Sequence, residues 1–194
     1  VLLFLMLQYE SFHTIFSTPE SMSKRLKNCI SGRIPKVDAV RDLLSRINPD
    51  EIRSIHEEMI DIIKRNRVFR EGTIGGYVVA GLDGVELFSS TKKSCPNCLS
   101  RKKHTGETEY FYRSVVCMII GKSPHVILGQ EMLKPRDGSG KDEGELTGGK
   151  RLIEQLKKRH GHFADVIVAD ALYLNAPFIN TLKENGLEGV IPVS

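Results

Sequence analysis

Residues 75–90 read GGYVVAGLDGVELFSS, and the rest of the chain can be interpreted around them. Residues 77–82 are β-branched, aromatic or small, a pattern typical of a strand that is covered on both faces of a sheet. Asp83 then places a charge in this apolar run, where a carboxylate loses hydration unless a basic side chain, backbone donors or a metal ion compensates it. Gly84 would let another backbone or a ligand approach closely. The alternative is an ordinary turn aspartate, since Asp-Gly is also a strong hairpin signal.

The composition is that of a globular protein. The chain has 194 residues, of which 40% are hydrophobic and 27% charged, and this length is enough for one sizeable core. The net charge of +4 is compatible with a nucleic-acid partner without being diagnostic of one. The apolar opening, residues 1–7, is too short to span a bilayer, so we expect no membrane segment there. Because the chain begins at Val1 and stops at Ser194 inside an apolar run, we expect a fragment.

The pattern changes near Gly72 from helical spacing to strands, so we predict a helical N-terminal region over residues 1–71 and an α/β domain over residues 72–194. Helices are expected around residues 4–16, from Pro35 to about residue 47, and from Pro49 to about residue 67. The third has a predicted core face that consists of Ile52, Ile55, Met59, Ile62 and Ile63.

The second half alternates strands and helices. Strands are expected in residues 75–90, 109–120, 125–133, 165–170 and from 189 onward, with helices over 145–160 and 176–185. Short connections favour an antiparallel meander for the first three strands. The order strand, strand, strand, helix, strand, helix, strand is that of a ribonuclease-H-like fold.

This order would bring two distant carboxylates together. A helical crossover makes the fourth strand parallel to its neighbour, so Asp83 and Asp170 would occupy adjacent positions if that neighbour is the first strand. Two unpaired carboxylates this close repel each other, and divalent cations resolve the repulsion. Mg²⁺ prefers a few carboxylate oxygens together with water and phosphate oxygens. Two such ions, about 4 Å apart, can activate water and stabilise the leaving oxygen in phosphodiester cleavage.

Several motifs resemble those of bacterial insertion-sequence transposases of the DDE type. Asp83-Gly84 followed by residues 86–90 (ELFSS) resembles the first catalytic block of this family, and residues 170–175 (DALYLN) resemble the second. Residues 144–147 (GELT) and 95–98 (CPNC) are also similar. The resemblance covers roughly residue 23 to the end. It implies an enzyme that uses Mg²⁺ or Mn²⁺ to nick double-stranded DNA at transposon ends and to join the freed 3′ hydroxyl to target DNA.

The resemblance also implies a prokaryotic, nucleoid-associated protein of the cytoplasm, compatible with a homodimer. The third acidic residue of the family, a Glu on a later helix, is not in this chain and would lie beyond Ser194. We therefore expect the chain by itself to bind Mg²⁺ poorly and to cleave nothing. Glu145 is interpreted as a helix-start charge. Two alternatives stay open: a non-catalytic DNA- or zinc-binding relic of the fold, and a ribonuclease-H-like nuclease that cuts without strand transfer.

The four cysteines, Cys29, Cys95, Cys98 and Cys117, are too few and too unevenly spaced for a disulfide scaffold, which indicates a reducing compartment. Cys95-x-x-Cys98 is half of a structural Zn²⁺ site, with His104 as a candidate third ligand. A redox pair and two ordinary loop thiols are the alternatives. Cys117 lies in an apolar strand and is interpreted as a buried thiol, and Cys29 as a core residue.

Basic residues cluster after the first strand, and we expect them to lie near the site. We predict that they contact DNA phosphates, which would make binding salt-dependent; a solubilising loop tip is the alternative. The residues are Lys92, Lys93, Arg101, Lys102 and Lys103.

Overall fold

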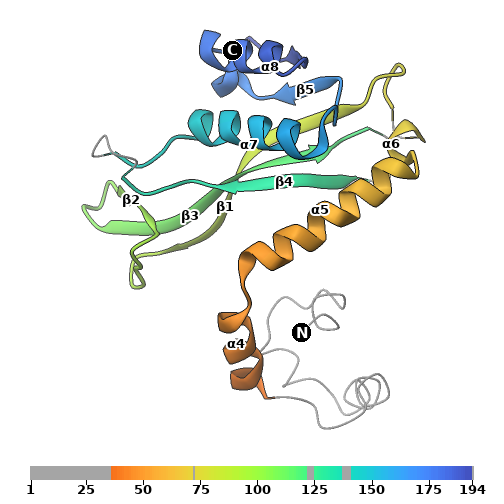
Figure 1. Ribbon diagram of the computed structural model, residues 1–194. Coiled ribbons are helices and arrows are strands. Elements are labelled where there is room, and N and C mark those ends of the chain that lie inside the picture. Colours follow the sequence, from red (N-terminus) through yellow and green to blue (C-terminus); the bar gives the residue numbers. More distant parts are fainter. Residues whose placement is uncertain (1–35, 72, 122–124, 137–140, 194) are drawn as a thin grey trace, which may run out of the picture. The chain divides into compact units, whose positions relative to one another are not determined.

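The computed structural model describes residues 36–71, 73–121, 125–136 and 141–193 (Figure 1). The chain divides into two compact units, with the boundary between His56 and Glu57. The helix expected around residues 4–16, and Cys29, lie outside the described residues. In the part that is described, no helix combines the length and the apolar character needed to cross a bilayer.

Three helices precede the sheet in the described chain: α4 (Val37–Arg46), α5 (Pro49–Arg65) and α6 (Val68–Glu71). Asn48 stabilises the start of α5, because its side chain accepts a hydrogen bond from the Asp50 N–H at 3.0 Å. The second unit begins at Glu57, so the last two turns of α5 and all of α6 belong with the sheet.

The core face predicted for α5 is wrong at four of its five residues. Ile60 is fully buried and Ile63 packs against the core, but the other four predicted residues are more than half exposed, namely Ile52, Ile55, Met59 and Ile62. Polar contacts explain this orientation of the second unit's part of α5. Glu57 pairs with Arg159, Asp61 lies 2.9 Å from the His160 ring, and Lys64 donates to the His160 carbonyl. Positions 57, 60, 61 and 64 share one helix face, and residues of this face contact Arg159 and His160 at the end of α7.

Six strands form one mixed sheet (Figure 1). They are β1 (Val79–Ser90), β2 (Leu99–Lys102), β3 (Thr108–Ile119), β4 (Val126–Met132), β5 (Val166–Ala169) and β6 (Glu188–Val190). The predicted antiparallel meander of β1, β3 and β4 is confirmed. β5 is parallel to β1, and β6 is parallel to β5. The spatial order is β2-β3-β1-β5-β6, with β4 also beside β3.

The α/β class is therefore confirmed, but the order of strands differs from the expectation. The polar segment after β1 was expected to contain no strand, and it contains β2, which forms a hairpin with β3. β1 occupies one edge of β3, so β2 and β4 share its other edge, one after the other. Polar residues can form this strand because Leu99 is buried while the next three residues point to solvent or pair with neighbours.

Helix α7 (Glu145–His160) begins and ends where the sequence predicted, and it packs on β3 and β4. The short helix η1 (Ala171–Tyr173) and helix α8 (Ala176–Glu184) follow β5. Two glycines let α7 approach the sheet closely. A Cβ added at Gly149 would lie 2.9 Å from the Tyr173 ring and 3.3 Å from Leu82, so this position has no room for a larger side chain.

Gly149→Val tests this packing. We expect it to lower the free energy of unfolding by about 2–4 kcal/mol, because the branched side chain overpacks the contact between α7 and β1. The matched control is Thr147→Val, which places the same side chain at an exposed position of the same helix and should change stability by less than about 0.5 kcal/mol. Urea denaturation measures both. Equal losses in the two variants would contradict the close packing of Gly149 against Tyr173 and Leu82.

Candidate functional site

The candidate site lies on β1 at Asp83. The alternative of a hairpin turn is wrong, because β1 runs through Asp83 and Gly84, which pair with Val116 and Val115 of β3. The expectation of a buried carboxylate is also wrong. Leu82 is buried and Asp83 is exposed, since successive residues of a strand face opposite sides of the sheet.

Asp170 follows the last residue of β5. Leu82 and Ala169 are partners in the parallel register of β1 and β5, so Asp83 and Asp170 occupy the next position on each chain. Both aspartates are exposed. The sheet therefore brings together two carboxylates that are 87 residues apart in the sequence (170 − 83).

Each of these carboxylates uses one oxygen locally. The Asp83 Oδ1 accepts a hydrogen bond from the Gly84 N–H at 2.7 Å. The Asp170 Oδ1 accepts from the Leu172 N–H at 3.0 Å and so caps η1. These bonds hold the two side chains in defined orientations, and the Oδ2 atom of each has no hydrogen bond or ion pair within the described residues.

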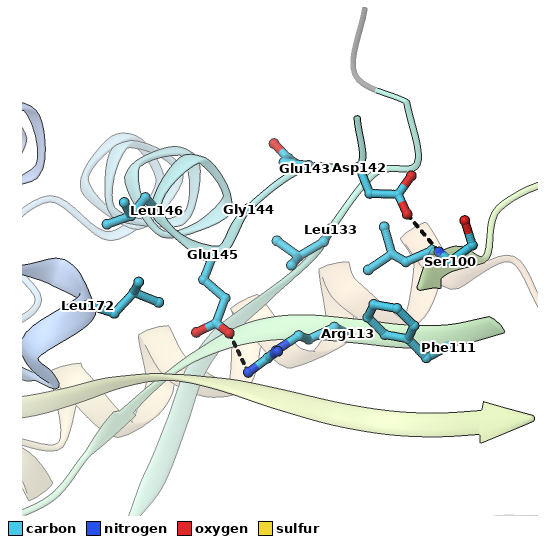
Figure 2. Close-up of a pocket in the computed structure, with 11 residues that line it drawn as sticks. Ser100, Phe111, Arg113, Leu133, Asp142, Glu143, Gly144, Glu145, Leu146 and Leu172 are labelled. Atoms are coloured by element: carbon cyan, nitrogen blue, oxygen red, sulfur yellow. Dashed lines mark hydrogen bonds and ion pairs between the residues drawn. The ribbon is translucent and has the colours of Figure 1, made fainter. Parts of the chain in front are cut away.

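A third carboxylate, Glu145, adjoins the pair. Its side chain is only 9% exposed, and it forms an ion pair with Arg113 of β3 (Figure 2). The Glu145 carboxylate also lies against Gly84, where an added Cβ would be 2.2 Å from Oε2. Gly84 thus admits the Glu145 side chain beside Asp83. Glu145 does open α7, as expected, but its side chain turns toward the site.

The electric field of the aspartates reaches Glu145. Burial raises the pKa of Glu145 above its ordinary value, the Arg113 guanidinium acts to lower it, and the charges of Asp170 and Asp83 raise it further. Tyr173 is close to the same charges: burial raises its pKa, and Glu145, Asp170 and Asp83 add to the rise. The Tyr173 hydroxyl is buried and has no hydrogen-bond partner among the described residues.

Sequence reasoning missed Arg113 and the role of Gly84. Arg113 interrupts an otherwise apolar stretch of β3, and a charge at such a place was the available signal. Its partner could not be read from the pattern, because Glu145 lies 32 residues later (145 − 113) on another element.

The donor atoms at the site suit a hard divalent cation. Exposed carboxylate oxygens at neighbouring positions, with room for water, are what Mg²⁺ or Mn²⁺ prefers. Glu145 is engaged by Arg113, and the described residues contain no group of three or more His, Cys, Asp or Glu side chains placed to hold a metal. Asp83 and Asp170 therefore fit as two ligands of an ion that takes its other ligands from water and substrate.

A pocket of about 300 Å³ lies beside Glu145, between β2, β3 and the start of α7 (Figure 2). The Asp142 carboxylate closes one side by accepting a hydrogen bond from the Ser100 N–H at 2.6 Å. Apolar side chains contribute most of its wall, among them Leu99, Phe111, Leu133, Leu146 and Leu172.

The Zn²⁺ candidates do not all come together. The sulfurs of Cys95 and Cys98 are 2.7 Å apart. His104 lies in the turn that joins β2 to β3, and the length of β2, about 10 Å for three residue steps, separates it from Cys98. Two ligands of one Zn²⁺ ion both lie about 2 Å from the metal, so His104 does not complete this site. Cys117 is fully buried in the sheet, as expected, and burial raises its pKa to about 12.

Of the five basic residues predicted to contact DNA, Arg101 and Lys103 form ion pairs within the described residues. Arg101 pairs with Glu86 at 2.9 Å and with Glu109 at 2.7 Å, and Lys103 pairs with Glu109 at 2.9 Å. Arg101 additionally lies over the Phe111 ring, 4.6 Å from its centroid. These two residues stabilise the β2–β3 hairpin.

The other three basic residues of the predicted set form no ion pair with the described residues. Lys92, Lys93 and Lys102 are exposed, and no ion pair engages their side chains in the described part of the chain. Lys92 and Lys93 follow the end of β1. Seven residue steps from Asp83 to Ser90, about 23 Å of strand, separate that end from the aspartates, so the expectation that they lie near the site is wrong.

No protein-family model, curated protein or solved structure matches the chain. Its function is therefore inferred from the geometry of the site and from the sequence motifs.

A double-mutant cycle tests the contact between Gly84 and Glu145. Gly84→Ala should lower the free energy of unfolding by about 1–2 kcal/mol, because the new Cβ displaces the Glu145 carboxylate from the Arg113 guanidinium. In a Glu145→Ala background the same substitution should be neutral or slightly stabilising, since the carboxylate is gone. Equal effects of Gly84→Ala in both backgrounds, measured by urea denaturation, would contradict the contact.

Proposed function

We propose that the chain carries the catalytic core of a DDE-type transposase, which cleaves DNA strands at the ends of an insertion sequence and joins them to target DNA with the help of Mg²⁺ or Mn²⁺. The single observation that supports this proposal is the register of β1 and β5, in which Leu82 and Ala169 are partners and Asp83 and Asp170 take the next position on each chain. Both aspartates belong to the motifs that resemble the two acidic blocks of the family.

The strand order supports a ribonuclease-H-like assignment of the fold. Read from β4 through β3, β1 and β5 to β6, with β2 left out, the sheet has three antiparallel strands followed by two parallel additions, an arrangement that is consistent with that fold. In a sheet with helical crossovers, ligands bind outside the carboxyl ends of the parallel strands, where the strand order reverses. Asp170 lies at the carboxyl end of β5, beside β1, where the chain order changes direction.

The proposed chemistry needs carboxylate oxygens that face solvent. Asp83 and Asp170 would hold the cation through their Oδ2 atoms, while their Oδ1 atoms keep the backbone hydrogen bonds. When bound, the cation neutralises charge on a phosphate and activates a water or a 3′ hydroxyl for in-line attack. Arg113 neutralises Glu145, so only two uncompensated negative charges repel an approaching DNA phosphate.

The lysines extend the proposed DNA path. About 23 Å separates Asp83 from the end of β1, a length that spans about seven base pairs of a duplex at 3.4 Å per pair. A duplex lying along β1 would therefore place one phosphate at the aspartates and others at Lys92 and Lys93. This arrangement accounts for basic residues that are remote from the site and whose side chains form no ion pair with the described residues.

The metal site is tested by the isosteric variants Asp83→Asn and Asp170→Asn. Asparagine keeps the oxygen that accepts the backbone N–H and removes the charge, so the fold should be retained. We expect each variant to weaken Mn²⁺ binding to the chain at least about tenfold in titration calorimetry, because a carboxylate ligand is lost. In a longer protein that contains this chain and cleaves DNA, either variant should abolish the Mg²⁺-dependent cleavage.

Glu184→Gln is the control, since it removes one exposed carboxylate of α8 and should leave Mn²⁺ affinity unchanged. Wild-type affinity in both aspartate variants would reject the site. Cleavage of DNA without joining would support the ribonuclease-H-like nuclease as the activity in place of the transposase.

The DNA path is tested by Lys92→Ala/Lys93→Ala. We expect this double variant to weaken duplex DNA binding by about tenfold at low salt and to reduce the slope of log K against log salt by about two, since two phosphate contacts are lost. Lys158→Ala/Lys183→Ala removes the same charge from exposed positions on α7 and α8 and serves as control. Fluorescence anisotropy at several salt concentrations measures both. Identical slopes in the two variants would contradict the proposed path.

A further inference from the structure

The Cys95-x-x-Cys98 motif remains unexplained by the proposed function. Its two sulfurs are 2.7 Å apart, well inside the contact distance of two thiols that do not interact, and both cysteines are reduced. The Cys98 N–H donates to the Cys95 carbonyl at 3.1 Å, so Pro96 and Asn97 form a tight turn that holds the pair together. A disulfide bond of about 2.05 Å requires the sulfurs to move by less than about 1 Å.

A third polar group completes the cluster. The Tyr112 hydroxyl of β3 lies 2.5 Å from the Cys95 sulfur. Tyr112 is held in place by the sheet, because its backbone pairs with Phe88 of β1 and its ring contacts the Phe88 ring at a centroid distance of 6.5 Å. The hydroxyl can therefore donate a hydrogen bond to a thiolate at Cys95 without any rearrangement of the strand.

The two cysteines differ in their surroundings. Cys95 is partly exposed, whereas Cys98 is 9% exposed and buried against the sheet. The hydrogen bonds from the Cys98 thiol and the Tyr112 hydroxyl hold the pKa of Cys95 below its ordinary value. The bond to Cys95 and burial raise the pKa of Cys98. One sulfur is thus accessible and activated, and the other is shielded and directly behind it.

We propose that Cys95 and Cys98 form a thiol–disulfide exchange site whose substrates are low-molecular-weight disulfides such as glutathione disulfide. Cys95 is the attacking sulfur, Cys98 is the resolving sulfur, and Tyr112 positions and stabilises the Cys95 thiolate. This site is independent of the proposed DNA chemistry, so failure of either proposal leaves the other intact.

The exchange proceeds in two balanced steps. The Cys95 thiolate attacks one sulfur of the small disulfide, a protein–glutathione disulfide bond forms, and one glutathione thiolate leaves. The Cys98 thiol then loses its proton to solvent and attacks Cys95, which forms the Cys95–Cys98 disulfide and releases the second glutathione. Two protein thiols are oxidised, and one molecule of glutathione disulfide is reduced to two of glutathione.

A metal does not explain the cluster as well. A structural Zn²⁺ site needs four ligands, and within the described residues no third Cys, His, Asp or Glu joins these two sulfurs. Cys117 is buried on another part of β3, and His104 is at the far end of β2.

The experiment uses the full chain with Cys29→Ala, so that Cys95, Cys98 and the buried Cys117 are the only thiols. The protein is exposed to glutathione disulfide, trapped with N-ethylmaleimide and analysed by intact mass and peptide mapping. We expect loss of two hydrogens, a Cys95–Cys98 disulfide and an unmodified Cys117 that reacts at least about a hundredfold more slowly. Cys98→Ser should stop at a stable glutathione adduct on Cys95, and Cys95→Ser should remain unmodified.

The rate–pH profile of Cys95 distinguishes the proposed role of Tyr112 from a purely structural one. Tyr112→Phe should slow the reaction of Cys95 about three- to tenfold at neutral pH, shift the midpoint of its rate–pH profile upward, and leave the rate at high pH unchanged. The thermal midpoint of each reduced variant, measured in parallel, shows that it is folded. Zinc at about one equivalent in the purified chain, or a glutathione adduct that Cys98 does not resolve, would overturn the proposal.

Discussion

The parallel pairing of β1 with β5 is the constraint on which the candidate site depends. Its register, with Leu82 opposite Ala169, is enforced by burial: both side chains lie in the core, and a slip of one residue would turn every side chain of β5 to the other face. The aspartates lie one step further along each chain, so this register sets the positions of their backbones. The hydrophobic core thus positions the charged groups, although it makes no contact with a substrate.

Charge balance decides how the polar groups at this end of the sheet are arranged. Three carboxylates adjoin one another, and a single guanidinium, Arg113, binds the most buried of them, Glu145. Leaving a buried carboxylate unpaired costs the most free energy, because the group has lost its hydration. Asp83 and Asp170 are exposed and keep much of their hydration. The exposed pair is consequently the one left for a ligand.

A second ion cluster fixes the start of α7. Arg151 pairs with Glu131 at 2.7 Å and with Glu143, and the Glu143 carboxylate also accepts from the Lys134 N–H at 2.8 Å. Burial acts to raise the pKa of Glu143, but Arg151 and this N–H outweigh it and hold the pKa below its ordinary value. The cluster ties the segment after β4 to the helix, and Glu145 follows it directly. The contacts of Glu143 with Arg151 and Lys134 thus hold the start of α7, from which the Glu145 side chain reaches Gly84.

Local signals predicted much of the fold. The bounds of α7 followed from the acidic residue at its start, the basic last turn and Gly161, which has a positive φ of 65° at the helix end. The apolar runs of β1, β3, β4 and β5 were also recognisable. The face of α5 was not predictable, because apolar residues occupy more than one side of it and the choice depends on α7. The pairing of Arg101 with Glu86 and Glu109 was hidden for the same reason, since three strands contribute to it.

The sequence by itself determined the order of the main helices and strands other than β2, and the resemblance of their motifs, because these depend on neighbours within a few positions along the chain. Only the tertiary structure decided that Asp83 faces solvent and lies in a continuing strand, that Glu145 reaches Gly84 and Arg113, and that His104 is separated from the cysteines. Each of these outcomes follows from which strands pair and in what register, and that pairing is chosen by burial of the whole core.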